Sequence, residues 1–100
     1  METVPKILVV DDNNALRILL SKMLSRLGFE VASADGGENG LRIFLRNEFD
    51  MVFSGYEMPG MDGVAFARSI KKKSPRTRVV INHDGRWKGK RFIQKQHRGG

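Results

Sequence analysis

Cysteine is absent from this chain of 100 residues, and its absence excludes several kinds of chemistry. Without a thiol there is no disulfide, no thiolate nucleophile and no cysteine-based metal site. No apolar run approaches the roughly 18 residues that a membrane-spanning helix needs. Residues 1–6 also lack the charged and apolar regions of a secretory signal peptide. We therefore expect one small domain that resides in the cytoplasm.

Acidic residues are scarce in the last third of the chain. Residues 68–100 contain a single acid, Asp84, and twelve lysines and arginines, whereas residues 1–67 contain ten acids and six lysines and arginines. Such a division indicates an acidic body with a basic end. We expect the body to occupy residues 1–82 and the basic segment, a ribbon or a tail, to occupy residues 83–100.

Apolar runs and helical patterns alternate along the body. Short apolar runs predict strands at residues 6–10, 29–33, 50–54 and 79–81. Apolar residues at helical spacing predict helices at residues 15–27, 38–47 and 64–73. This alternation is typical of an α/β protein with a parallel sheet and helices on both of its faces.

The first predicted helix carries six large apolar residues at a spacing that places them in one stripe, which we expect to be buried: Leu16, Leu19, Leu20, Met23, Leu24 and Leu27. The second predicted helix has a shorter apolar face, made of Leu41, Phe44 and Leu45. Asn13 or Asn14 is a good N-cap for the first helix, and Gly28 is a good terminator for it.

The alternation ends at Asn82. A parallel crossover usually needs a dozen or more residues with a helix inside, and no amphipathic helix follows Ile81. Asp84-Gly85 between strand-like runs is instead a hairpin signal. We therefore predict an antiparallel ribbon after the fourth strand, and a frayed tail stays open as the alternative.

Two segments follow strands at the edge of the sheet where ligands bind in open α/β folds. Asp11 and Asp12 come directly after the first strand, and the glycine-rich loop of residues 53–63 follows the third. The acid pair is either a metal site or a polar helix start. Asp62 is well placed to cap the third helix.

Four segments, placed in this element order, resemble the receiver domain of bacterial response regulators: ILVVDD at residues 7–12, LGFEV at 27–31, DGGENGL at 35–41 and MPGMDG at 58–63. The resemblance covers residues 6–81. It implies a flavodoxin-like, doubly wound parallel sheet. In this chain we expect the order 2-1-3-4, with an irregular or antiparallel C-terminal segment in place of the family's fourth helix, fifth strand and fifth helix.

The family's chemistry is then expected at the acid pair and the loop. Such domains accept a phosphoryl group from a histidine kinase on an aspartate at the end of the third strand, beside a Mg²⁺ ion. By resemblance, Asp11 and Asp12 match the acidic pair that holds the metal, and Glu57 offers its backbone carbonyl. The acceptor position falls on Gly55, which has no carboxylate.

Two further positions sense the phosphate in this family. The serine or threonine after the fourth strand falls at about His83, which is not a hydroxyl residue. The lysine after the fifth strand matches Lys95, which arrives about one helix too early and is followed by Gln96 where proline is usual. Ser54 could substitute as a phosphoacceptor, but a small residue that ends a buried strand is the simpler interpretation. For Asp62, capping of the third helix is likewise a simpler explanation than a role as a substitute phosphoacceptor.

These matches predict a pseudo-receiver, that is, a receiver-like signalling domain of a two-component phosphorelay that is not phosphorylated because Gly55 replaces the acceptor. It would act by contact with a histidine kinase or another signalling protein. Mg²⁺ would bind weakly at Asp11 and Asp12, with most of its shell left to water. We also expect a homodimer or an exchange of the C-terminal segment between chains.

The alternative function is a basic module that associates with nucleic acid through residues 86–98. Six cations there could contact phosphates, and Trp87 and Phe92 could stack on bases: Arg86, Lys88, Lys90, Arg91, Lys95 and Arg98. An enzyme is not expected, because the sequence offers no nucleophile with a base, no phosphate-cradling loop and no ligand cluster.

Overall fold

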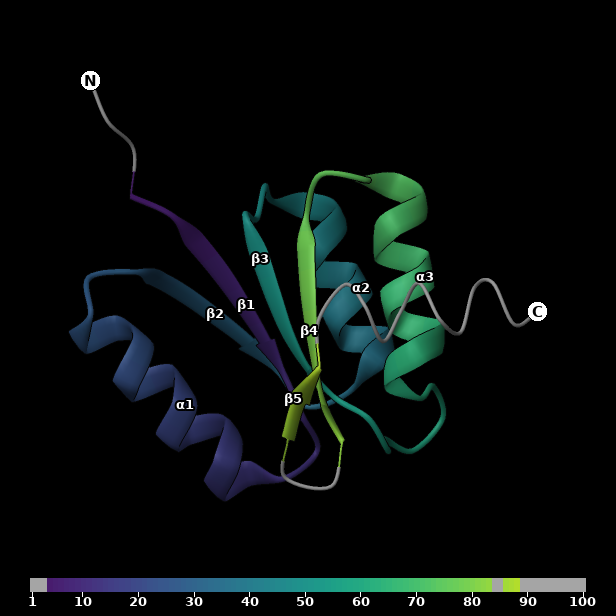
Figure 1. Ribbon diagram of the computed structural model, residues 1–100, viewed down its shortest axis with the longest axis horizontal. Coiled ribbons are helices and arrows are strands. Elements are labelled where there is room, and N and C mark those ends of the chain that lie inside the picture. The colour runs from purple at the N-terminus through teal and green to yellow at the C-terminus, as the bar shows by residue number, and fades with distance from the viewer. Residues whose placement is uncertain (1–3, 84–85, 89–100) are drawn as a thin grey trace.

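Five strands form one sheet in the order β2-β1-β3-β4-β5 (Figure 1). The computed structural model describes residues 4–83 and 86–88. The strands are β1 (Lys6–Val10), β2 (Glu30–Ala34), β3 (Met51–Gly55), β4 (Arg78–His83) and β5 (Arg86–Lys88), and the helices are α1 (Asn14–Arg26), α2 (Gly37–Arg46) and α3 (Gly63–Lys73). The flavodoxin-like sheet and its order are thereby confirmed.

The last strand runs against its neighbour, as predicted. Strands β1 to β4 pair in parallel, whereas β5 pairs antiparallel with β4, with Asn82 opposite Trp87 and His83 opposite Arg86. The turn expected at residues 84–85 lies outside the described residues, but the strands on either side of it form the predicted ribbon. A short ribbon thus occupies the sheet edge beside β4.

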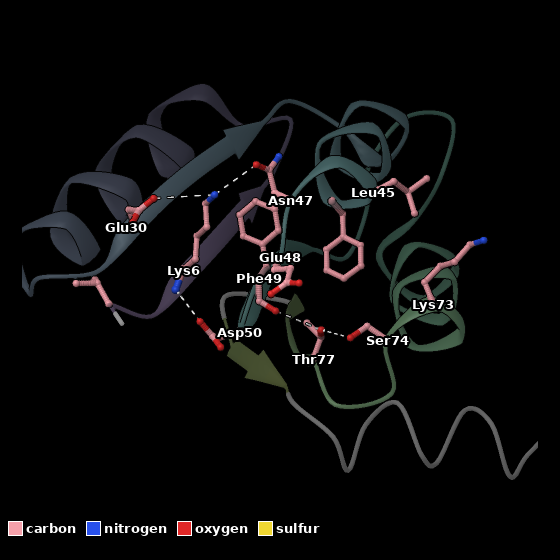
Figure 2. A pocket seen from close by; sticks show the side chains of 12 residues that line it. Lys6, Glu30, Leu45, Asn47, Glu48, Phe49, Asp50, Lys73, Ser74 and Thr77 are labelled. Atoms are coloured by element: carbon pink, nitrogen blue, oxygen red, sulfur yellow. Dashed lines mark hydrogen bonds and ion pairs between the residues drawn. The ribbon is translucent and has the colours of Figure 1, made fainter. Parts of the chain in front are cut away.

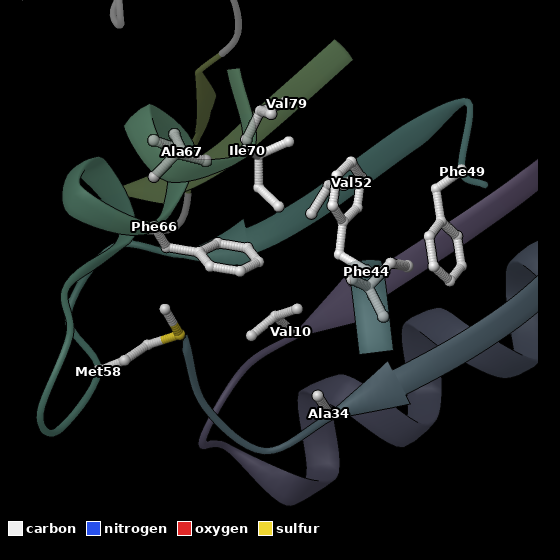
Figure 3. Packing of buried hydrophobic residues seen from close by; sticks show 12 residues of the cluster. Val10, Ala34, Phe44, Phe49, Val52, Met58, Phe66, Ala67, Ile70 and Val79 are labelled. Atoms are coloured by element: carbon white, nitrogen blue, oxygen red, sulfur yellow. The ribbon is translucent and has the colours of Figure 1, made fainter. Parts of the chain in front are cut away.

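The principal core lies between the sheet and the pair α2 and α3 (Figure 3). Leu8, Val52 and Ile81 on the strands and Phe66 and Ile70 on α3 are each 0% exposed. Burial of each such side chain stabilises the fold by about 1.5–3 kcal/mol. Two helices packed side by side thus cover this face of the sheet from β2 to β4.

Local signals fix the helix ends where the sequence predicted them. The Asn13 side chain accepts a hydrogen bond from the Leu16 backbone N–H at 3.0 Å and begins α1. Gly28 follows the end of α1 with φ of +99°, a conformation that favours glycine. Asp62 accepts from the Ala65 N–H at 2.8 Å and begins α3.

The prediction that α1 buries its whole apolar stripe is wrong. Leu24 is buried, but Leu19, Met23 and Leu27 are 57%, 53% and 72% exposed. Helix α1 packs on β1 and β2, and among the described residues no second helix lies beside it on that face. The outer flank of the stripe therefore has nothing to pack against.

Leu45 on α2 was also expected to be buried, and it is 59% exposed. The buried side of α2 is set by Gly37, Gly40 and Phe44 instead. A Cβ on Gly40 would lie 3.0 Å from the ring of Phe66 and 3.0 Å from a Val10 methyl. The helix therefore packs closely through a small residue, which turns Leu45 away from the core.

Within the described residues, no helix is both long and apolar enough to cross a membrane.

Truncation of the core should separate buried from exposed positions. We expect Ile70→Ala to lower the free energy of unfolding by about 2–5 kcal/mol, because it leaves a cavity between α3 and the sheet. The control is Leu45→Ala, which should change it by less than about 0.5 kcal/mol. Urea denaturation followed by circular dichroism measures both, and equal losses would contradict the assigned core.

Candidate functional site

Asp11 lies where β1 ends, between the carboxyl ends of β2 and β3. Its backbone N–H donates to the Ala34 carbonyl at 3.1 Å, and its Oδ1 accepts from the Asn13 N–H at 2.9 Å. The residue is only 7% exposed. The carboxylate is thus fixed at the edge of the sheet by the two strand ends and by the turn that starts α1.

Gly55 ends β3 directly beside this carboxylate. A Cβ on Gly55 would lie 3.0 Å from Asp11 Oδ2 and 3.1 Å from its Cγ. The carboxylate therefore lies against the backbone of Gly55, in the space that a side chain at position 55 would enter. The structure brings together two of the positions that the sequence singled out.

The electrostatics of this pair favour a nearby cation. Burial raises the pKa of Asp11, the hydrogen bond from Asn13 opposes this shift, and the neighbouring Asp12 carboxylate raises the pKa further. A raised pKa means that Asp11 ionises less readily in the folded chain than in the unfolded one, so the folded state loses stability as the pH rises through the raised pKa. A cation close to both carboxylates would offset the burial and the repulsion.

Arg17 is a residue of the site that sequence reasoning missed. Its guanidinium donates to the Asp11 carbonyl at 2.7 Å and to Asn14 Oδ1 at 2.6 Å. It therefore braces the turn between β1 and α1 that carries both acids. The sequence signal that could have identified it is the position of Arg17 in the first turn of α1, which follows the acid pair.

The loop after β3 is anchored by its apolar residues and by Gly63. Met58 is 7% exposed and belongs to the principal core, whereas Glu57 is exposed. The Gly63 N–H donates to the Tyr56 carbonyl at 2.7 Å, and a Cβ on Gly63 would collide with the Gly55 carbonyl. Glycine at 63 thus lets the loop close tightly onto the end of β3.

Ser54 and Asp62, the two candidates for a substitute acceptor, are both engaged elsewhere. The Ser54 side chain is completely buried, and its hydroxyl donates to the Gly55 carbonyl at 2.9 Å. Asp62 caps α3. Asp50, expected to open the third strand, precedes β3 and accepts from the Lys6 N–H at 2.8 Å.

His83 reaches the same edge of the sheet from the end of β4. The Tyr56 N–H donates to the Asn82 carbonyl at 3.0 Å, and the rings of Tyr56 and His83 lie 4.1 Å apart between centroids. The imidazole thus packs against the residue that follows Gly55. Lys95, the second predicted sensing residue, lies outside the described residues.

Three positions in the loops after β1 and β3 offer hard oxygen atoms. Asp11 and Asp12 supply two carboxylates, and Glu57 lies in the loop that follows Gly55. No group of three acidic, histidine or cysteine side chains able to hold a metal occurs within residues 4–83 and 86–88. The donor set suits Mg²⁺, which commonly takes one or two carboxylates and keeps several waters.

A hollow of about 760 Å³ lies at the opposite ends of the strands (Figure 2). Lys6 Nζ donates to Asn47 Oδ1 at 3.3 Å and lies 4.0 Å from a Glu30 carboxylate oxygen. The Ser74 and Thr77 hydroxyls are 2.7 Å apart. These polar groups link neighbouring elements, so we regard the hollow as a structural junction rather than the functional site.

The chain is similar to known receivers. A family model described as the response regulator receiver domain matches residues 7–84. A probable chemotaxis protein CheY of Rhizobium etli is 40% identical over 67 residues, which cover 66% of this chain and 52% of that protein. The chain thus spans about half the length of this relative, and as little as 9% of larger ones.

Solved structures give the same similarity in three dimensions. The response regulator TrrA of Thermotoga maritima in complex with Mg²⁺ and BeF has a TM-score of 0.76 and 34% identity, over 81% of this chain and 72% of that one. The complex of the histidine kinase ThkA with TrrA gives a TM-score of 0.73 and 36% identity, over 78% and 67% of the two chains.

The role of Asp62 can be tested by separating its charge from its hydrogen bond. We expect Asp62→Ala to lower the free energy of unfolding by about 1 kcal/mol, because the Ala65 N–H loses its acceptor. Asp62→Asn keeps an acceptor oxygen and should retain most of that stability. Thermal or urea unfolding measures both, and an equal loss in the two variants would mean that the charge, not the cap, matters.

Proposed function

Since the chain belongs to the response regulator receiver domain family, we propose that it is a receiver of two-component signalling that accepts no phosphoryl group and signals by protein contact. The observation that supports this proposal is Gly55, which ends β3 with its backbone against the Asp11 carboxylate. In this proposal Gly55 occupies the acceptor position of the family. A glycine offers no carboxylate for a covalent bond to phosphorus.

Neighbouring side chains do not replace the missing carboxylate. The Ser54 hydroxyl is completely buried and bonded to the Gly55 carbonyl, and the Asp62 carboxylate is occupied as a helix cap. Asp11 itself is held by Asn13. In this interpretation the remaining acids keep their structural roles, and the domain is a pseudo-receiver.

The same residues would still hold a cation. Asp11 and Asp12 would bind Mg²⁺ with the Glu57 carbonyl, and water would fill the other positions. When bound in a receiver, Mg²⁺ neutralises charge on the phosphoryl group that is transferred. Here Arg17 would keep the acid-bearing turn in place, and binding would be weak because one carboxylate is missing.

The proposed partner is a histidine kinase or another signalling protein. The kinase ThkA forms a complex with the similar receiver TrrA, which supports a protein partner for this fold. The same proposal includes a domain at residues 1–82 and a basic segment at 83–100. It also includes a cytoplasmic location, the lack of enzymatic activity, and the homodimer or segment exchange expected from the sequence. His83 and Lys95 stay predicted sensing positions.

Nucleic-acid binding is not proposed as a second function. Of residues 86–98, only Arg86, Trp87 and Lys88 lie among the described residues. The Trp87 ring packs against Phe53 at a steep angle, with centroids 5.3 Å apart. No observation in this part of the chain favours the alternative.

The absence of phosphorylation is directly measurable. We expect no mass increase after incubation with acetyl phosphate and Mg²⁺, because no acceptor carboxylate faces the site. Prompt intact-mass spectrometry detects an adduct of about 80 Da, one phosphoryl group. The receiver TrrA serves as the positive control, and a stable adduct on an aspartate of this chain would overturn the proposal.

Restoring the carboxylate should restore the chemistry. The Gly55→Asp variant should gain the adduct. Without Mg²⁺ this variant should be less stable to unfolding than the parent chain, because its Cβ would lie 3.0 Å from Asp11 Oδ2 and its side chain would add a third carboxylate. At a Mg²⁺ concentration of about 100 Kd, binding should raise its stability by about 2.7 kcal/mol. Gly55→Asn, of equal size, is the matched control. An adduct on both variants, or on neither, would show that Gly55 is not the deciding residue.

A further inference from the structure

One face of the sheet is only partly covered by the described residues. Helix α1 packs on β1 and β2, whereas α2 and α3 together span the other face from β2 to β4 (Figure 1). In the parallel pairing, Phe53 lies beside Val80, so both side chains point to the α1 side. Both are only partly buried. Among the residues that the structure describes, nothing covers the apolar strip that β3 and β4 form next to α1.

Helix α1 supplies one wall of this open strip. Leu19, Met23 and Leu27 are four residues apart and form one exposed row along the helix. The opposite flank of the helix carries Arg17, which lines a small hollow with Ser33 of the edge strand β2 and residues of α2. The exposed apolar row is therefore turned away from the β2 edge and toward the middle of the sheet.

Between the wall and the strip lies a groove with an apolar floor. A hollow of about 410 Å³ is lined by Ile7, Leu24, Phe29, Met51 and Phe53, among others. Trp87 of β5 extends this surface beyond Phe53 and is 40% exposed. Contiguous exposed apolar surface is a feature of many binding sites.

The charges around the groove are mainly positive. Arg76 and Arg78 line the hollow from the β4 side, and both are exposed. Asp50 also lines it, but its carboxylate accepts the backbone N–H of Lys6. Helix α1, which forms the other wall, contains no acid in residues 14–26. The groove thus combines an apolar floor with a cationic rim.

We propose that this groove binds an acidic amphipathic helix of a partner protein. A helix packs against another helix at about 8–10 Å between axes, and α2 and α3 pack side by side on the opposite face of the same sheet. A helix beside α1 would complete the second layer in the same way. Its apolar side would cover Met23 and Phe53, and its acids would face Arg76 and Arg78. The proposal holds whether or not Gly55 prevents phosphorylation.

The charge distribution disfavours the two occupants that the chain itself could supply. A second copy would offer its α1, which carries Arg17, Lys22 and Arg26 and no acid. Residues 89–100 contain four lysines and arginines, no acid, and only Phe92 and Ile93 as large apolar residues. Each would bring positive charge to a positive rim, which opposes binding.

Trp87 is the only tryptophan of the chain and reports on the groove directly. The probe is a synthetic helix of about 18 residues, long enough to form in water, with leucine at helical spacing and glutamate elsewhere. We expect this peptide to shift the Trp87 emission to shorter wavelength in a saturable way, and the affinity to fall with salt. The control peptide has lysine for every glutamate. Equal binding of the two peptides, or binding of neither, would overturn the proposal.

Variants locate the peptide on the protein. Arg76→Glu with Arg78→Glu should weaken binding by about tenfold or more, because the rim charge is reversed. Met23→Gln should weaken it similarly without loss of stability, since Met23 is 53% exposed. Leu45→Gln on α2 is the matched control and should bind like the parent chain. Unchanged binding in the first two variants would contradict the site. If sedimentation at high protein concentration shows a dimer, and Met23→Gln makes it dissociate, the groove would be assigned to a second copy instead.

Discussion

The central strands β1 and β3 carry apolar side chains on both faces, so both faces of the sheet must be covered for the domain to be stable. Helices α2 and α3 meet this requirement on one side, where Phe66 and Ile70 are completely buried. Helix α1 meets it only in part on the other. The parallel pairing that imposes this constraint also brings the ends of β1 and β3, and with them Asp11 and Gly55, to one edge.

Features that depend on a few neighbouring residues could be predicted from the sequence. Asn13 and Asp62 cap helices because their side chains reach N–H groups three residues ahead. The antiparallel ribbon followed from a connection too short for a helix. The exposure of Leu19 and Leu45 could not be predicted, because helical spacing places residues on one side of a helix but does not say what packs there.

The candidate site shows the same division. The position of the acids after β1 and of Gly55 after β3 follows from the order of elements, and so does their meeting at one edge. The direction of the Asp11 carboxylate, which lies against Gly55, depends on the bond from Asn13 and on the adjacent strands. Arg17 was missed because its partner is a backbone carbonyl, which no residue pattern reveals.

The tight contact at Gly63 ties the end of β3 to the start of α3. Since the Gly63 N–H donates to the Tyr56 carbonyl and a Cβ on Gly63 would collide with the Gly55 carbonyl, the first turn of α3 packs against the last peptide of the strand. The end of β3 and the start of α3 are therefore joined by direct backbone contact. Because the two backbones touch, a displacement of Gly55 would change the space available to the first turn of α3.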